Sequence, residues 1–322
     1  MIKQLFLSLL ITSFTASSVL SDGVETLPTL EAGTLTLCLP RNSGVLAGKR
    51  AQGGFGFEYE IGKLLAAELS LELKPISFEH ELEEESDPVR ATYAMLAYPL
   101  CDLVSGQPLY KRAMGVPVFE RASMPRWVGM PQEIDLDTGH RKNILAGFVD
   151  VKPIDVSLAY MRAGVGLVKR KGLRDPANLH DLGDAILGFQ QGSLSGAIAM
   201  VNLRPAELRS ARKFNPGASF LWEVEKNKLA YALTDLTAFD SYRKSNPLTE
   251  YELSTWQHRF GLDIGFAVLE SNHALKEAVN SVLQRPDVKN QLPELAKSVG
   301  LSFVAPTGKG IAPDFTMEML RE

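Results

Sequence analysis

The segment Ser105–Arg112 combines hydroxyl, glycine and cationic residues directly after a predicted strand, so it could bind a small acid. Ser105 ends the apolar run and Gly106 follows it. An arginine can hold a carboxylate through two parallel hydrogen bonds, which makes Arg112 the leading candidate. Alternatively, Arg112 is a surface side chain beside Lys111. If Arg112 does bind a carboxylate, we expect Ser105, Gly106 and Arg112 to lie together at one edge of a sheet.

A second candidate segment is Gln190–Ser195, between a predicted strand and a predicted helix. Ser193 or Ser195 could cap the helix. The backbone N–H groups at the start of that helix could also bind an anion. The two roles are compatible, and both stay open.

A third candidate is Asp240, which ends a predicted strand at Leu236–Phe239. A carboxylate there could hold the ammonium group of a ligand. The alternative is that Asp240 caps the following helix.

The sequence segments that resemble catalytic motifs are all incomplete. The glycines of Gly192–Gly196 have the wrong offsets for a nucleophile elbow. Thr307–Gly310 lacks the leading glycine and the Ser/Thr of a phosphate-binding loop. No nucleophile–base pair can be identified. We therefore expect a protein that is not an enzyme and that needs no cofactor.

The composition is that of a globular protein. The 322 residues are 45% hydrophobic and 22% charged, and 34 Lys and Arg stand against 38 Asp and Glu. With no basic excess to neutralise phosphates, nucleic-acid binding is not expected. The five histidines are scattered without ligand spacing, so no metal site is expected.

Residues 1–21 resemble a secretory signal peptide. Lys3 is the positive end, Leu5–Phe14 is a short apolar core, and Val19-x-Ser21 fits a small-residue cleavage site. The apolar core is too short to span a bilayer, which takes about 20 residues. We expect cleavage before Asp22 and a soluble, monomeric product in a bacterial periplasm.

Two cysteines, Cys38 and Cys101, each lie at an apolar run. An oxidising compartment favours a disulfide between them. The offset of neighbouring parallel strands could instead keep their Cα atoms out of reach. The pairing therefore stays open on the sequence alone.

Strands and helices alternate along the first block, roughly residues 33–121. Strands are expected at Thr34–Leu39, Leu71–Phe78 and Asp102–Ser105, and helices near Phe57 and Pro88. This alternation is typical of a parallel α/β sheet. Residues 122–157 break it and are interpreted as an insertion.

The alternation resumes in a second block, roughly residues 172–258. The elements expected there are strands at Ala185–Gln190, Phe220–Val224 and Leu236–Phe239, with helices at Ser193–Leu203 and Glu225–Leu233. A further strand is expected at Gly265–Leu269, followed by two helices, the last ending at Gly300.

Two α/β lobes with a cleft between them follow from this pattern. The expected division is a signal peptide at 1–21, lobe I at 22–165 with its insertion at about 122–157, lobe II at 166–260, and a return to lobe I with a tail at 261–322. Strand C-termini and helix N-termini would line the cleft, where such sheets bind ligands.

These segments, in this order, resemble the extracellular solute-binding proteins of the polar amino-acid uptake family (solute-binding family 3). The similarity covers residues 33–300 and rests on Gly54–Ile61, the strand ending in Lys111-Arg112, Gln191-Gly-Ser193 and the Asp235…Asp240 spacing. It implies a two-lobed type II periplasmic binding-protein fold with parallel-sheet lobes. It also implies that Arg112 holds an α-carboxylate and Asp240 an α-ammonium.

A narrower resemblance concerns lobe I. Cys38, Val89-Arg-x-Thr92 and Cys101-Asp-Leu-Val-x-Gly-x-Pro108 are similar to solute-binding-like proteins associated with periplasmic quinoprotein methanol dehydrogenases. Those proteins are accessory proteins rather than transporters.

Two functions are therefore expected as alternatives. In the first, the protein captures a small amino-acid-like or carboxylate ligand and delivers it to the permease of an ABC importer. In the second, it is an accessory protein of a periplasmic dehydrogenase, with Trp127 in the insertion as a candidate anchor.

Overall fold

The computed structural model describes residues 27–41, 43–48, 54–79, 88–134, 141–143, 147–215, 219–313 and 316–321. The predicted signal peptide lies outside these residues. Within them, no helix combines the length and the apolar character needed to cross a membrane.

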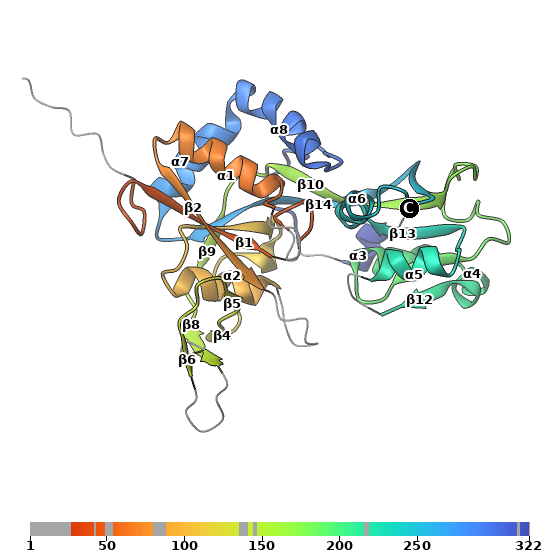
Figure 1. Ribbon diagram of the computed structural model, residues 1–322, viewed down its shortest axis with the longest axis horizontal. Coiled ribbons are helices and arrows are strands. Elements are labelled where there is room, and N and C mark those ends of the chain that lie inside the picture. The colour runs from red at the N-terminus through yellow and green to blue at the C-terminus, as the bar shows by residue number, and fades with distance from the viewer. Residues whose placement is uncertain are drawn as a thin grey trace, which may run out of the picture.

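One mixed ten-stranded sheet runs through the whole molecule (Figure 1). Its order is β12-β11-β13-β10-β14-β3-β1-β2-β5, and β9 also pairs with β14. The strands are β1 (Thr34–Pro40), β2 (Glu72–Glu79), β3 (Leu103–Pro108), β5 (Arg126–Trp127), β9 (Ile154–Val156), β10 (Met161–Arg170), β11 (Leu187–Gln190), β12 (Arg212–Phe214), β13 (Tyr231–Asp235) and β14 (Tyr251–Leu269).

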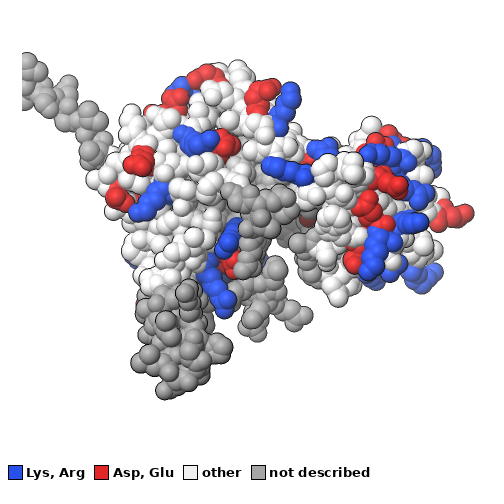
Figure 2. Space-filling model, viewed as in Figure 1, with Lys and Arg blue, Asp and Glu red and all other residues white. Residues whose placement is uncertain are grey.

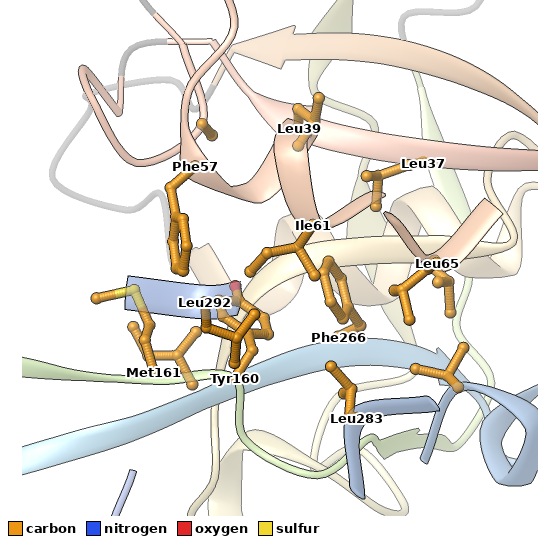
Figure 3. Packing of buried hydrophobic residues seen from close by; sticks show 14 of the residues in the cluster. Leu37, Leu39, Phe57, Ile61, Leu65, Tyr160, Met161, Phe266, Leu283 and Leu292 are labelled. Atoms are coloured by element: carbon orange, nitrogen blue, oxygen red, sulfur yellow. The ribbon is translucent and has the colours of Figure 1, made fainter. Parts of the chain in front are cut away.

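Lobe I is built on β1, β2 and β3, which pair in parallel as predicted. Helices α1 (Phe57–Glu68), α7 (His273–Gln284) and α8 (Pro286–Val299) supply apolar faces to one cluster of buried side chains. Figure 3 shows Ile61, Leu65 and Leu283 within it. Helix α2 (Pro88–Ala97) contributes to a second cluster with β1 and β3.

The predicted insertion forms short strands. These are β4 (Arg121–Ser123), β6 (Gln132–Ile134), β7 (Arg141–Asn143) and β8 (Phe148–Asp150), besides β5 and β9. The pairs β4–β8 and β6–β7 form two small sheets that project from lobe I in Figure 1.

Lobe II has its own two clusters, built on β10, β11 and β13. Its helices are α3 (Leu194–Asn202), α4 (Pro205–Ser210), α5 (Phe220–Lys226) and α6 (Leu236–Ser245). The lobe boundaries derived from the sequence stay predictions.

Three elements predicted for lobe II are wrong. Phe220–Val224 lies in helix α5, the predicted helix at 225–233 covers the end of α5 and the first three residues of β13, and Leu236–Phe239 begins helix α6. Short apolar runs do not distinguish a buried strand from the buried face of a helix. In α5 the buried Phe220, Leu221 and Val224 recur at helical spacing.

The disulfide is confirmed: Cys38 is bonded to Cys101, with their Cα atoms 5.7 Å apart. Strands β1 and β3 are direct neighbours, with Cys38 opposite Val104. Cys101 precedes β3, in a turn that brings it back within bonding distance. Asp102 fixes that turn, because its carboxylate accepts hydrogen bonds from the N–H of Leu30 and of Thr36, both at 2.7 Å.

Candidate ligand-binding cleft

Strands β10 and β14 cross from one lobe to the other as an antiparallel pair. Pro108, the last residue of β3, lies opposite Ile264, which lies opposite Met161. Asp235, the last residue of β13, lies opposite Val165. Along β10 the two strand ends are offset by residues 161 to 165, about 13 Å at a rise of about 3.3 Å per residue, and they lie three strands apart across the sheet, about 14 Å at a spacing of about 4.8 Å. The two ends therefore point toward each other across the connecting strands.

At the end of β3, Ser105 and Gly106 belong to a buried hydrogen-bond network around Glu58 of α1. The Ser105 hydroxyl donates to Glu58 Oε2 at 2.5 Å, and the Tyr160 hydroxyl donates to Glu58 Oε1. Gly106 N–H donates to the Tyr160 oxygen at 3.0 Å. The Ser105 hydroxyl and the Gly106 N–H, both predicted ligand contacts, are therefore bonded within lobe I.

Glu58 is fully buried, and this burial raises its pKa to about 7 although its hydrogen bonds from Ser105 and Tyr160 lower it. Burial also raises the pKa of Tyr160, with the Glu58 charge acting in the same direction. No pattern in the sequence indicates this network, because a glutamate in the first turn of a helix is ordinarily explained by the helix dipole.

Arg112 lies in the 3₁₀ turn η1 (Lys111–Ala113), four residues beyond the end of β3, and is exposed. Gly115, three residues further on, has a positive φ of 80° and pairs with Ile154, which turns the chain away from the strand end. The contact of Arg112 with a ligand at the lobe I edge of the cleft stays a prediction.

Ser193 and Ser195 lie at the start of α3, as predicted. Ser193 is the N-cap: its Oγ accepts from Gly196 N–H at 3.0 Å and donates to the Gln190 carbonyl at 2.9 Å. Ser195 is buried, with its Oγ 2.8 Å from Ser193 Oγ. Both hydroxyls thus act in capping. The first backbone N–H groups of α3 have no partner within the helix, which leaves the anion-binding role open.

Asp240 does not end a strand, which corrects the sequence prediction. It lies inside helix α6 and is fully buried. Its carboxylate accepts hydrogen bonds from Ser302 N–H at 2.5 Å and from the Ser302 hydroxyl at 2.9 Å, and pairs with Arg243 at 3.0 Å. These internal partners occupy the carboxylate that was expected to hold a ligand ammonium.

The acid that ends the strand is Asp235, five residues earlier, at the N-cap position of α6. Burial raises its pKa to about 6, while its own backbone N–H lowers it. Among the described residues, no cation forms an ion pair with Asp235. A desolvated carboxylate at the end of a strand, beside the connecting strand β10, can hold a ligand cation.

Two cavities lie where parts of both lobes or the connecting strands meet. The smaller, about 170 Å³, is lined by Gly44, Val45, Gly54 and Phe55 of lobe I and by Ser241, Lys244 and Ser245 of α6. The larger, about 280 Å³, lies between the connecting strands at Phe260–Asp263 and the tail at Thr307–Pro313. Both are at or below the lower end of the usual range for ligand pockets. Neither is lined by Arg112, Ser193 or Asp235.

No protein-family model matches the sequence, and no curated protein matches it. Solved structures do. An ancestral cationic amino-acid solute-binding protein superposes with a TM-score of 0.53 at 18% identity, covering 83% of this chain and 96% of the other. The unliganded, open L-cystine solute receptor of Neisseria gonorrhoeae gives 0.52 at 16%, covering 83% and 92%.

A histidine kinase sensor domain with similarity to periplasmic binding proteins also superposes, at a TM-score of 0.52 and 12% identity, covering 85% of this chain and 98% of the other. These superpositions extend over both lobes of the chain. The chain has the type II periplasmic binding-protein fold. At such identities the likeness concerns the fold alone.

The charged residues on the surface do not indicate which charge a ligand or partner would carry. Figure 2 shows acidic and basic side chains interleaved over lobe II, with no patch of one sign on this face. Recognition is therefore expected from a few placed groups rather than from a broad field.

Proposed function

We propose that this protein is a periplasmic solute-binding protein that captures a small amino-acid-like or carboxylate ligand between its lobes and serves an ABC importer. The observation that carries the proposal is the pair of opposed strand ends. The end of β3 leads to Arg112 and the end of β13 is Asp235, with an offset of about 13 Å along β10 between them. An arginine on one side and a desolvated carboxylate on the other suit a zwitterion.

Replacing Arg112 by alanine is expected to weaken binding of the ligand at least about tenfold, because the ligand carboxylate would lose its charged partner. The measurement is a thermal-shift screen of the mature protein against amino acids, small dicarboxylates, polyamines and short-chain acids and alcohols, followed by titration of each hit. Lys111→Ala is the matched control, since Lys111 is the exposed neighbour in the same turn. Equal affinities for wild type and Arg112→Ala would refute the carboxylate assignment.

The affinity for a zwitterionic hit is expected to rise as the pH increases from 5 to 7. Burial raises the pKa of Asp235 to about 6, and only the ionised form attracts an ammonium group. In Asp235→Asn the affinity should be lower at pH 7 and nearly independent of pH over this interval. A wild-type affinity that is flat over the same range, or that falls, contradicts the role of Asp235.

A second candidate function is an accessory role with a periplasmic quinoprotein dehydrogenase. The protein would then belong with the solute-binding-like proteins that are associated with methanol dehydrogenases. One observation favours it: the insertion projects from lobe I with Phe148 64% exposed (Figure 1). Phe148 replaces Trp127 as the candidate residue for binding a partner protein. Trp127 is partly buried against Tyr98 and pairs β5 with β2. Affinity capture with wild type and Phe148→Asp tests it. Recovery of a permease alone, with no redox enzyme, argues against the accessory role.

A further inference from the structure

The chain continues beyond α8 as an extended segment that contacts both lobes in turn. We define the strap as Leu301–Pro313 together with Thr316–Arg321. It lies against the connecting strands and ends in the 3₁₀ turn η2 (Met317–Leu320).

The first contact of the strap joins lobe II to the end of α8. Ser302 donates two hydrogen bonds to the buried Asp240 of α6, and Phe303 packs edge-on against Phe57 of α1, with ring centroids 6.0 Å apart. A neighbouring hydrogen bond also links α6 to α8, because Lys244 Nζ donates to the Val299 carbonyl at 3.0 Å. Helix α6 is thereby tied to lobe I.

The second contact is with the connecting strands themselves. Arg162 N–H of β10 donates to the Val304 carbonyl at 2.9 Å. Thr307 donates to the Asp263 carboxylate of β14 through its backbone N–H, at 3.0 Å to Oδ2, and through its hydroxyl, at 2.5 Å. The strap thus crosses both strands that any movement of one lobe relative to the other must bend.

The third and fourth contacts lie on opposite lobes. On lobe I, Ala312 N–H donates to the Leu109 carbonyl at 2.8 Å, and Lys111 N–H donates to the Ala312 carbonyl at 3.3 Å. On lobe II, Leu320 is fully buried, and its carbonyl accepts from Asn202 Nδ2 of α3 at 2.6 Å.

The Leu320 carbonyl also lies 3.1 Å from Nε2 of the buried His258, whose Nδ1 accepts from Phe260 N–H at 3.0 Å. Because Nδ1 is an acceptor, the ring proton lies on Nε2 and points at the strap. The lobe II end of the strap is therefore held by burial and by two donors.

The length of chain between these last two contacts limits how far the lobes can separate. Five peptide steps join Ala312 to Met317, and a fully extended chain of that length spans about 18 Å at most. A larger separation requires η2 to leave α3 or Ala312 to leave Leu109.

We propose that the strap holds the two lobes at one separation, so that opening of the cleft requires its release at α3 or at Leu109. This goes beyond the proposed solute capture, because it concerns the motion of the lobes whether or not a solute binds.

The test is the distance between spin labels on Lys289→Cys of α8 and Arg209→Cys of α4, both exposed sites away from the strap. It is measured without added solute. The wild-type background is expected to give one narrow distribution. A chain that ends at Gly300, which lacks the Ser302 contact with Asp240 and every later contact of the strap, is expected to give a broader distribution displaced to longer distances.

A second variant keeps every contact of the strap and guards against misfolding of the shortened chain. Six Gly and Ser residues inserted after Pro313 would lengthen the tether by about 20 Å, and the distribution should again broaden. Lys309→Ala, an exposed strap residue, is the matched control and should match wild type. Distributions in both the shortened and the lengthened chains that equal wild type would overturn the proposal and leave solute binding untouched.

Discussion

Replacing Cys38 and Cys101 together by alanine is expected to lower the free energy of unfolding by about 4 kcal/mol. The bond closes a loop of 63 residues, and cross-linking a loop of that length restricts the unfolded chain by about this amount. Both sulfur atoms are also buried in the core between α2 and the sheet, so their loss removes packing as well. Urea unfolding of wild type and the double variant, at matched protein concentration, measures the difference.

Two controls accompany this measurement. Wild type treated with reductant should unfold at a urea midpoint close to that of the double variant. Cys101→Ala alone also breaks the bond but keeps the buried Cys38 side chain, so it should be destabilised by an amount close to, and no larger than, that of the double variant. A loss below about 1 kcal/mol in the double variant would contradict the account, since the bond would then constrain little of the unfolded chain.

Glu58→Gln is expected to remove a large part of the dependence of stability on pH between 4.5 and 7, to which Asp235, with its pKa raised to about 6 by burial, also contributes. The pKa of Glu58 is raised from 4.5 to about 7 in the folded protein. In this interval the folded state binds more protons than the unfolded state, so wild type loses stability as the pH rises. Since a tenfold change in proton affinity corresponds to about 1.4 kcal/mol, the loss is about 3 kcal/mol.

Glutamine resembles the neutral acid in shape and hydrogen bonding, so Glu58→Gln should match wild type near pH 4.5 and exceed it above pH 7. Urea unfolding at pH 4.5, 6 and 8 measures this. Glu72→Gln, an exposed carboxylate on β2, is the control and should follow wild type. Equal slopes for wild type and Glu58→Gln would show that the network around Ser105 and Tyr160 does not hold a proton.

The elements that the sequence predicted correctly are the ones with long apolar periodicity. Helices α1 and α7 each present one buried face over three turns, and Gly300 ends α8 with a φ of 83°. The parallel strands of lobe I followed from their alternation with helices. These are patterns that local sequence determines without knowledge of the rest of the fold.

The incorrect predictions concern elements whose secondary structure is determined by tertiary packing rather than by local sequence. Strand β14 extends over Tyr251–Leu269, but only its last five residues have the apolar run of a buried strand. Its earlier part joins the lobes and pairs with β10 along one edge, a circumstance that composition does not reveal. The mistaken strand at Leu236–Phe239 displaced the predicted ligand carboxylate from Asp235 to Asp240.

The candidate site was predictable only in part. The position of Arg112 beyond β3 and the start of α3 after Ser193 followed from strand-to-helix transitions. The network of Glu58 and the strap did not, because each depends on contacts between segments far apart in sequence. Tyr160 reaches Glu58 from 102 residues away, and Ser302 reaches Asp240 from 62.

Amide hydrogen exchange with and without the strongest hit of the solute screen shows whether a solute binds between the lobes. The account predicts simultaneous protection at both strand ends, in Ser105–Ala113 of lobe I and in Gln190–Gly196 and Thr234–Thr237 of lobe II. Protection confined to one lobe, or to the projecting insertion, would contradict it.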